Sequence, residues 1–162
     1  MSSTPPLLRC PVCRGPLNGS DNPGAARGAL ACGSGHSFDA ARQGYYNLLV
    51  GKGTVFEADT PDMVAARFNF LEAGHYRPLA EAVAGTIARL VPPRGKFTVL
   101  DSGTGTGQYL RAVLDEVRRA TDNCTAVALD ISKFALRRAA RLNPEALCLA
   151  CDVWQPLPVA DA

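Results

Sequence analysis

Three cysteines and a histidine near the start of the chain have the residue types and spacing of metal ligands. A Cys-x2-Cys pair is followed by a Cys-x3-His pair, formed by Cys10, Cys13, Cys32 and His36. Two close ligand pairs on tight turns are how a short segment encloses tetrahedral Zn²⁺. Because a closed Cys3His site leaves no open position on the metal, we expect a structural zinc without chemistry at the ion. The alternative, unrelated cysteines and a loop histidine, fits less well because so small a segment needs a staple to fold.

A second Cys-x2-Cys, formed by Cys148 and Cys151, is not expected to bind metal. It falls in a predicted strand, where residues i and i+3 point to opposite faces. Its neighbours are apolar, so we interpret both cysteines as small buried hydrophobic residues. Cys124 receives the same interpretation.

A glycine-rich turn follows a predicted strand later in the chain. From Asp101 the sequence runs Asp-Ser-Gly-Thr-Gly-Thr-Gly, which places glycines at Gly103, Gly105 and Gly107. Between a strand and an amphipathic helix, such a loop lets the backbone pass close beneath a ligand. The dinucleotide fingerprint needs a glycine at position 108, which is Gln108. A nicotinamide dehydrogenase is therefore a distant alternative.

Acidic residues stand at the ends of three successive predicted strands, at Asp101, Asp130 and Asp152. Open α/β sheets bind ligands at this edge. Asp101 would repel a pyrophosphate but suits a cationic group, such as the ammonium or sulfonium of S-adenosylmethionine. Asp130 lies roughly 20 residues after the loop, where a carboxylate accepts hydrogen bonds from both ribose hydroxyls. Asp152, followed by Val153, is placed to reach the adenine amine.

Strand–helix alternation from residue 97 onward must position these acids. Short apolar runs predict strands at 97–101, 125–129 and 146–151, and apolar residues at helical spacing predict helices at 107–120 and 132–142. Continuous apolar strands alternating with helices indicate a parallel sheet covered on both faces. The predicted fold class is therefore α/β.

Two further helices and a turn-rich segment precede this unit. Thr60 and Pro61 predict the start of a helix that ends at Gly74, and a second helix fits 77–91. The second helix has an apolar stripe on one side; it contains Leu79, Val83, Ile87 and Leu90. In the first 50 residues, short apolar pieces such as those at 29–31 and 38 are expected to form a few ribbon strands.

Composition adds few constraints. The chain has 162 residues and a formal net charge of +2. No apolar run reaches the roughly 18 residues that a membrane span needs, and the first residues lack a secretion signal. We therefore expect a cytoplasmic protein with reduced thiols, in which metal binding explains the cysteine cluster. The densest basic run is interpreted as the solvated face of a helix; it contains Lys133, Arg137, Arg138 and Arg141.

The zinc pattern and the glycine loop occur together with further motifs that resemble one family, the 23S rRNA guanine-N1-methyltransferases. This family includes housekeeping bacterial enzymes and the tylosin-resistance enzymes of actinomycetes. The resemblance covers essentially residues 8–162. The motifs that carry it are Cys10-Pro-x-Cys13, Cys32-x3-His36-Ser-Phe-Asp, Gln43-Gly-Tyr-Tyr-Asn-Leu-Leu49, Asp59-Thr-Pro-Asp-Met-Val-Ala-Ala-Arg67, Leu71-x2-Gly-His-Tyr-x-Pro-Leu79, Leu129-Asp-Ile-Ser-Lys133 and Asp152-Val-Trp154.

The resemblance implies a zinc-binding module for rRNA recognition at 1–50, a linker with connecting helices at 51–96, and a class I Rossmann-like S-adenosylmethionine-dependent methyltransferase domain at 97–162. It implies methylation of guanine N1 in a hairpin loop of 23S rRNA, with a macrolide-resistance role compatible. The family's cofactor contacts map onto Tyr76, Gly105 and Thr106, beside the loop and strand-end residues above. The expected cofactors are S-adenosylmethionine and structural Zn²⁺. The expected partner is an rRNA hairpin rather than DNA or a membrane, and a homodimer stays open.

One feature departs from the family. Only 64 residues run from Val99 to Ala162, whereas a doubly wound domain needs about six strands. We therefore expect the methyltransferase domain to be incomplete at its C-terminus, with the catalytic residues unknown. Two other functions remain: a truncated, non-catalytic zinc and RNA-binding module, and a methyltransferase acting on a small molecule or a protein.

Overall fold

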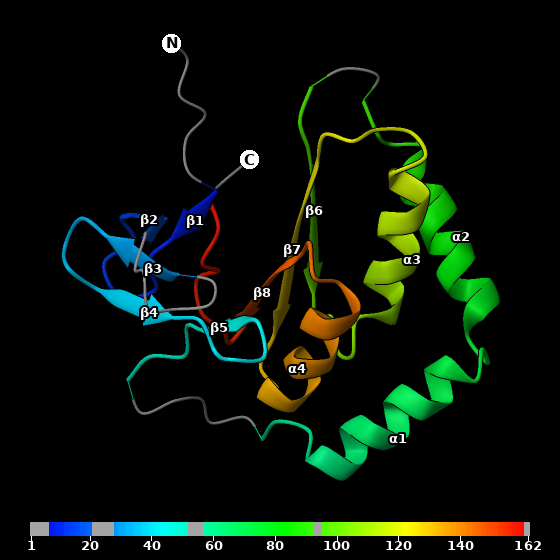
Figure 1. The fold of residues 1–162 in the computed structure, drawn as a ribbon, viewed down its shortest axis with the longest axis horizontal. Coiled ribbons are helices and arrows are strands. Elements are labelled where there is room, and N and C mark those ends of the chain that lie inside the picture. Colours follow the sequence, from blue (N-terminus) through cyan, green and yellow to red (C-terminus); the bar gives the residue numbers. More distant parts are fainter. Residues whose placement is uncertain (1–6, 21–27, 52–56, 93–94, 161–162) are drawn as a thin grey trace.

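The computed structural model describes residues 7–20, 28–51, 57–92 and 95–160, and it contains two four-stranded sheets (Figure 1). The first sheet is antiparallel in the order β1-β2-β3-β4, and the second is parallel in the order β5-β8-β7-β6. The strands are β1 (Leu8–Arg9), β2 (Pro16–Ser20), β3 (Ala29–Cys32), β4 (Ser37–Asp39), β5 (Tyr45–Asn47), β6 (Phe97–Ser102), β7 (Cys124–Asp130) and β8 (Leu147–Ala150). The helices are α1 (Pro61–Glu72), α2 (Arg77–Ala88), α3 (Gln108–Val117) and α4 (Lys133–Leu142).

The predicted helix starts and the parallel arrangement of the strands both form as the sequence predicts. Thr60 caps α1 by accepting a hydrogen bond from the Met63 N–H, and Ser132 caps α4 by accepting one from the Ala135 N–H. A parallel register places Asp101 opposite Ala128 and the end of β7 opposite β8, so all three strands end at one edge. Within the described residues, no helix is both long and apolar enough to cross a membrane.

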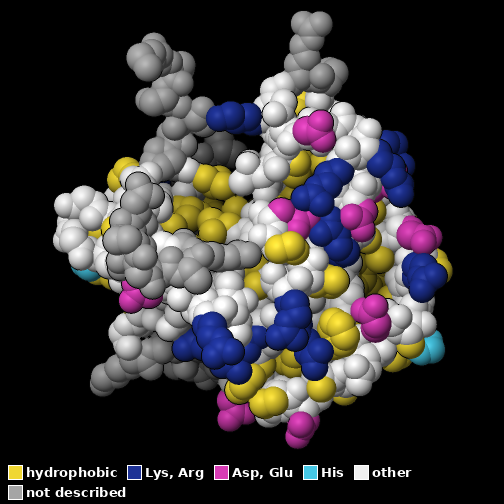
Figure 2. All heavy atoms as spheres, viewed as in Figure 1, with side chains coloured by type: hydrophobic (Ala, Val, Ile, Leu, Met, Phe, Trp, Pro, Cys, Tyr) yellow, Lys and Arg dark blue, Asp and Glu magenta, His cyan; other side chains and the backbone are white. Residues whose placement is uncertain are grey.

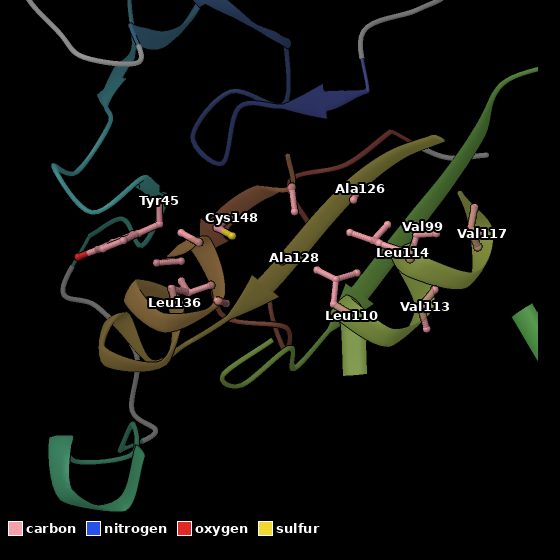
Figure 3. Packing of buried hydrophobic residues seen from close by; sticks show 14 of the residues in the cluster. Tyr45, Val99, Leu110, Val113, Leu114, Val117, Ala126, Ala128, Leu136 and Cys148 are labelled. Carbon is pink, nitrogen blue, oxygen red and sulfur yellow. The ribbon is translucent and has the colours of Figure 1, made fainter. Parts of the chain in front are cut away.

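One face of the parallel sheet is covered by α3 and α4 (Figure 3). Leu110 of α3 and Leu136 of α4 are fully buried there against β6, β7 and β8. Burial of each leucine side chain contributes roughly 2 kcal/mol to folding. Helix α2 packs on the outside of α3 as a second layer (Figure 1).

The opposite face is covered by the antiparallel sheet rather than by helices. Leu8, Leu17 and Leu30 from the small sheet pack in one cluster with Leu129 and Leu149. Coverage does not reach β6, where Leu100 is 43% exposed. The prediction of a sheet covered on both faces therefore holds over β7 and β8 but not over β6.

Strand β5 links the two sheets, and the sequence pattern did not predict it. Tyr45 and Tyr46 lie on opposite faces of the parallel sheet, one in each core cluster. They pair with Cys148 and Leu149 of β8. Because β5 falls inside the segment 1–50, the sheet takes its edge strand from the predicted zinc module, and the division of the chain at residue 50 stays a prediction.

The apolar stripe of α2 lies mostly on the exposed side of the helix. Leu79, Val83 and Leu90 are all exposed, and Ala84 is the buried residue of the helix. The reason is geometric: α2 contacts α3 through the Ala84 side, and Ile87 of the stripe packs at the margin of that contact. Helical spacing predicted the helix but not which side would be covered.

Candidate functional site

The four predicted metal ligands lie together. The ligand atoms of Cys10, Cys13, Cys32 and His36 are all within 4.8 Å of one another. The sulfurs of Cys13 and Cys32 are 3.6 Å apart, and Cys32 Sγ is 3.3 Å from His36 Nδ1. A tetrahedral zinc with Zn–S bonds near 2.3 Å requires sulfur–sulfur distances of about 3.8 Å. The donor set and its spacing therefore fit Zn²⁺, with Nδ1 as the histidine ligand.

Backbone turns hold these ligands in a state suited to metal binding. The Gly15 backbone N–H lowers the pKa of Cys13 to about 6, so that this thiol is ionised at neutral pH. The pKa of Cys32 is also lowered: burial raises it, but contacts with His36 more than offset that effect. On the second turn, the Cys32 N–H donates to the His36 carbonyl, and Gly35 takes the left-handed conformation.

The other cysteines are placed apart from this cluster. Cys148 is fully buried in β8, and Cys151 follows it in a buried position, as expected. Burial, with the charges of Asp130 and Asp152, raises the pKa of Cys151 to about 11, so it stays a thiol. Cys124 was wrongly interpreted as buried: it begins β7 at the sheet margin and is partly exposed.

The glycine loop wraps over the end of β7. Gly103 and Thr104 both donate their N–H groups to the Leu129 carbonyl, at 2.9 Å. The three glycines of the loop all have positive φ. Thr106 is buried and contacts the Gln108 side chain at the start of α3. The loop thus turns the chain from β6 into α3 across the edge where the acids lie.

Gly107 is expected to tolerate no side chain. Its φ is +86°, and a Cβ there would lie 2.6 Å from Asn143 Nδ2 and 2.9 Å from Ala139 Cα. We expect Gly107→Ala to lower the free energy of unfolding by about 3 kcal/mol, because strain and overlap add. The control is Gly95→Ala, where φ is +104° but no atom of the described residues outside its chain neighbours lies within 4 Å; we expect a loss of about 1 kcal/mol. Urea unfolding measures both, and equal losses would contradict the close approach of α4.

Asp130 braces the loop and the start of α4 at once. Its Oδ2 accepts the Gly105 N–H at 2.8 Å, and its Oδ1 accepts the Ser132 N–H at 2.8 Å. Each carboxylate oxygen has a second lone pair, so both oxygens can still accept ribose hydroxyls. The predicted ribose contact thus stays a prediction, and the bracing role is one that spacing alone did not reveal.

Asp101 is a half-buried acid whose Oδ2 has no hydrogen-bond partner among the described residues. Burial raises its pKa and the nearby charge of Asp130 adds to this effect, while a hydrogen bond from the Thr104 side chain opposes it. The carboxylate oxygen without a partner suits the cationic group of a ligand such as S-adenosylmethionine. The cofactor contact of Asp101 stays a prediction.

Replacing Asp101 by Asn is expected to stabilise the ligand-free protein while weakening S-adenosylmethionine binding. A raised pKa in the folded state means that Asp101 favours folding when protonated, and that this contribution is lost as pH rises through the folded-state pKa. At pH 8 the variant should therefore melt about 2 °C higher and bind the cofactor about tenfold more weakly. Thermal melts at pH 4 to 8 test this, since the gain should shrink toward pH 4. A lower melting temperature at pH 8 would contradict it.

A cavity of about 340 Å³ lies at the strand ends, large enough for a small cofactor. Of the predicted cofactor contacts, Gly103, Asp130, Asp152 and Val153 line it, whereas Asp101, Gly105, Thr106 and Gly107 do not. The Asp152 side chain accepts the N–H of Trp154, which forms the turn after β8. Four further lining residues come from the linker, α1 and that turn: Glu57, Asp59, Arg67 and Trp154. The residue patterns did not single them out, and only the family motifs include the segments 59–67 and 152–154.

Tyr76 lies elsewhere, at the start of α2. It is half-exposed and lines a second cavity of about 270 Å³, between α1, α2 and α3. Its ring contacts Phe70. Gln108 lines the same cavity and contacts Thr106 of the glycine loop, so the two cavities adjoin the loop from different sides. The cofactor contact of Tyr76 stays a prediction.

The fold and the site define a class of protein. A zinc ribbon with a Cys3His cluster is joined to a mixed α/β fold that has a glycine loop and acidic residues at one edge of its parallel sheet. Residues 8–51 match the family model for the zinc ribbon at the N-terminus of RlmA.

Two sequence relatives carry the name of the family that the motifs resemble. The chain is 49% identical over 97% of its length to a Micromonospora griseorubida protein assigned as a 23S rRNA (guanine-N(1)-)-methyltransferase. It is 47% identical over 95% of its length to the 23S rRNA (guanine(748)-N(1))-methyltransferase of Streptomyces fradiae. The matches cover 55% and 51% of those proteins, so the chain spans about half the length of the curated relatives it matches. The chain is a homologue of the 23S rRNA guanine-N1-methyltransferases, and the resemblance seen in its motifs is confirmed.

Among solved structures, a crystal structure of the plantazolicin methyltransferase BpumL with a triazolic desmethylPZN analog and SAH matches 56% of this chain and 34% of its own. The identity is 21% and the TM-score is 0.42. A TM-score this low adds nothing to the strand order described above.

Proposed function

We propose that the protein is an S-adenosylmethionine-dependent methyltransferase that modifies N1 of a guanine in 23S rRNA. The observation that carries this proposal is the 49% and 47% identity, over nearly the whole chain, to proteins with this named activity. The cavity lined by Gly103, Asp130 and Asp152 supports it, because its size and its acidic side chains suit a small cationic cofactor. We also propose the division into a zinc module at 1–50, connecting helices at 51–96 and a methyltransferase domain at 97–162.

Different residues at this edge of the sheet are proposed to contact different parts of the methyl donor. S-adenosylmethionine, when bound, supplies a methyl group on a positively charged sulfur. Asp101 does not line the cavity, and we propose that its negative charge attracts the cationic part of the donor from beside it, while Asp130 fixes the glycine loop. Their main contribution to rate is positioning, since alignment of donor and acceptor removes entropy from the barrier. Loss of the guanine N1 proton calls for a base, and we assign that role to none of the described residues.

The zinc ribbon is proposed to hold the target RNA next to this edge. A cavity of about 310 Å³ separates the ribbon from the turn after β8, with Pro11 and Arg14 on one side and Asp152 and Gln155 on the other. Arg14 donates to the carbonyls of Pro156 and Leu157, which fixes the ribbon against that turn. We propose a hairpin loop as the target, because its unstacked bases can enter a pocket. A cytoplasmic location follows from that substrate, and a homodimer stays a prediction.

Labelled methyl transfer tests the proposed function. The native protein is incubated with radiolabelled S-adenosylmethionine and, separately, with unmethylated 23S rRNA, total protein or a small-molecule extract. We expect label in the rRNA alone, at one guanine whose N1 methyl group blocks reverse transcription. Label in protein or small molecules would favour another substrate. An absence of transfer despite measured cofactor binding would overturn the proposal.

A further inference from the structure

Helix α4 carries a row of cations on its exposed face. Its sequence is Lys-Phe-Ala-Leu-Arg-Arg-Ala-Ala-Arg-Leu, without an acidic residue. Lys133, Arg137 and Arg141 follow one another at four-residue spacing and are all exposed. The opposite side of the helix is buried against the parallel sheet through Leu136 and the alanines around it. Figure 2 shows the blue Lys and Arg side chains gathered over α4.

These cations differ from the arginines of the neighbouring helix. Arg111, Arg118 and Arg119, in and just after α3, all form ion pairs with nearby acids. In the described part of the chain, no ion pair involves Lys133, Arg137, Arg138 or Arg141. Like charges four residues apart on a helix repel each other. A helix that served folding alone would gain from acids at these positions, as α3 does.

Two aromatic rings hold arginines in place on this surface. The Arg138 guanidinium lies 4.5 Å from the centre of the Phe68 ring of α1, and the Arg137 guanidinium lies 5.1 Å from that of Phe134. Cation–π contacts restrain a flexible side chain without neutralising its charge. Each guanidinium keeps its planar edge for a bidentate contact with phosphate. Phe134 is itself 39% exposed and offers a face on which a base can stack.

The cationic face begins at the cofactor cavity. Ser132, the residue that caps α4, lines that cavity together with Asp130. From there α4 extends about 15 Å, at 1.5 Å per residue. A polyanion lying along α4 would therefore have one end at the place where a methyl group is delivered.

We infer that the exposed face of α4 binds the phosphate backbone of the RNA substrate and leads it to the cofactor cavity. The surface comprises Lys133, Phe134, Arg137, Arg138 and Arg141. This inference rests on the proposed function, since it takes the substrate to be RNA. Its chemistry is sequence-independent phosphate contact, so it supplies affinity and register but does not select the base.

The test compares two double variants of the native protein with equal changes in charge. Arg137→Gln with Arg141→Gln removes two cations from α4, and Arg118→Gln with Arg119→Gln removes two paired arginines beyond α3. Glutamine keeps helix propensity close to that of arginine. The dissociation constant for a 23S rRNA transcript is measured by filter binding at several salt concentrations. The KM for rRNA and the melting temperature are measured alongside.

We expect the α4 variant to bind rRNA at least tenfold more weakly at low salt, with a log–log salt slope reduced by about 1.4, or 0.7 for each lost phosphate contact. The control variant should bind as the wild type does. Equal effects in both variants, or an unchanged slope in the α4 variant, would overturn the inference. If wild-type protein binds rRNA through α4 but transfers no methyl group, the proposed function is contradicted and the RNA-binding role of α4 is supported. If methyl transfer proceeds with an unchanged KM for rRNA in the α4 variant, the RNA-binding role of α4 is contradicted and the proposed function is supported.

Discussion

Replacement of Cys13 by serine is expected to release the zinc ion and to unfold the antiparallel sheet β1–β4. Cys13 provides one of four ligand atoms that lie within 4.8 Å of one another. Structural zinc binding contributes on the order of 10 kcal/mol, which is comparable with the whole stability of a domain. Removal of one thiolate should reduce the zinc content from one ion per chain to near zero. Metal analysis and hydrogen exchange of residues 8–39 measure the two effects.

The unfolding should stop before β5. Tyr45 and Tyr46 are held by the parallel ladder with β8 and by the two cores, not by the metal. We therefore expect fast exchange through β4 and continued protection at β5 and in β6–β8. Cys124→Ser is the matched control, because it makes the same change in a partly exposed cysteine outside the cluster. A Cys13 variant that kept one zinc per chain would contradict the ligand assignment.

Replacement of Asp130 by Asn should uncouple the glycine loop from α4. The two carboxylate oxygens accept the N–H groups of Gly105 and Ser132. An asparagine keeps one acceptor and turns its amide N–H groups toward the other donor. Loss of one charge-assisted hydrogen bond costs about 2 kcal/mol. We expect cofactor binding to re-order the freed loop at this cost, which corresponds to a roughly 30-fold weaker affinity for S-adenosylmethionine. Titration calorimetry with the cofactor measures this loss.

The control for this substitution lies near the other end of the same strand. Asp122 is exposed, two residues before β7 begins. Asp122→Asn makes the same chemical change and should leave the cofactor affinity unchanged. An Asp130 variant that bound the cofactor as tightly as the wild type would show that the brace seen between the loop and α4 has no part in binding.

The sequence predicts those elements whose pattern is local. Strands β6, β7 and β8 and helices α3 and α4 follow from apolar runs and helical spacing. The metal ligands are found together because two close pairs on tight turns leave few other arrangements. The acids share an edge because parallel strands must end together.

The rest depends on contacts between distant parts of the chain. Strand β5 has three residues, too few for an alternating pattern, and its partner lies far along the sequence. The stripe on α2 has helical spacing, yet only the packing of α2 on α3 decides which side is buried. Likewise, the spacing of Asp130 suggested a ligand contact, whereas its hydrogen bonds to the loop and to α4 appear only in three dimensions.

The pairing of β5 with β8 also sets an order of events during synthesis. Tyr45 pairs with Cys148, so the β5 segment leaves the ribosome about 100 residues before its partner. At 5–20 residues per second, this delay is on the order of 10 s. The zinc ribbon can close around its metal in that time, but the two tyrosines that will be buried in the parallel sheet stay without their partner strand. Their exposure makes this interval the period in which the nascent chain is most prone to aggregate or to be bound by a chaperone.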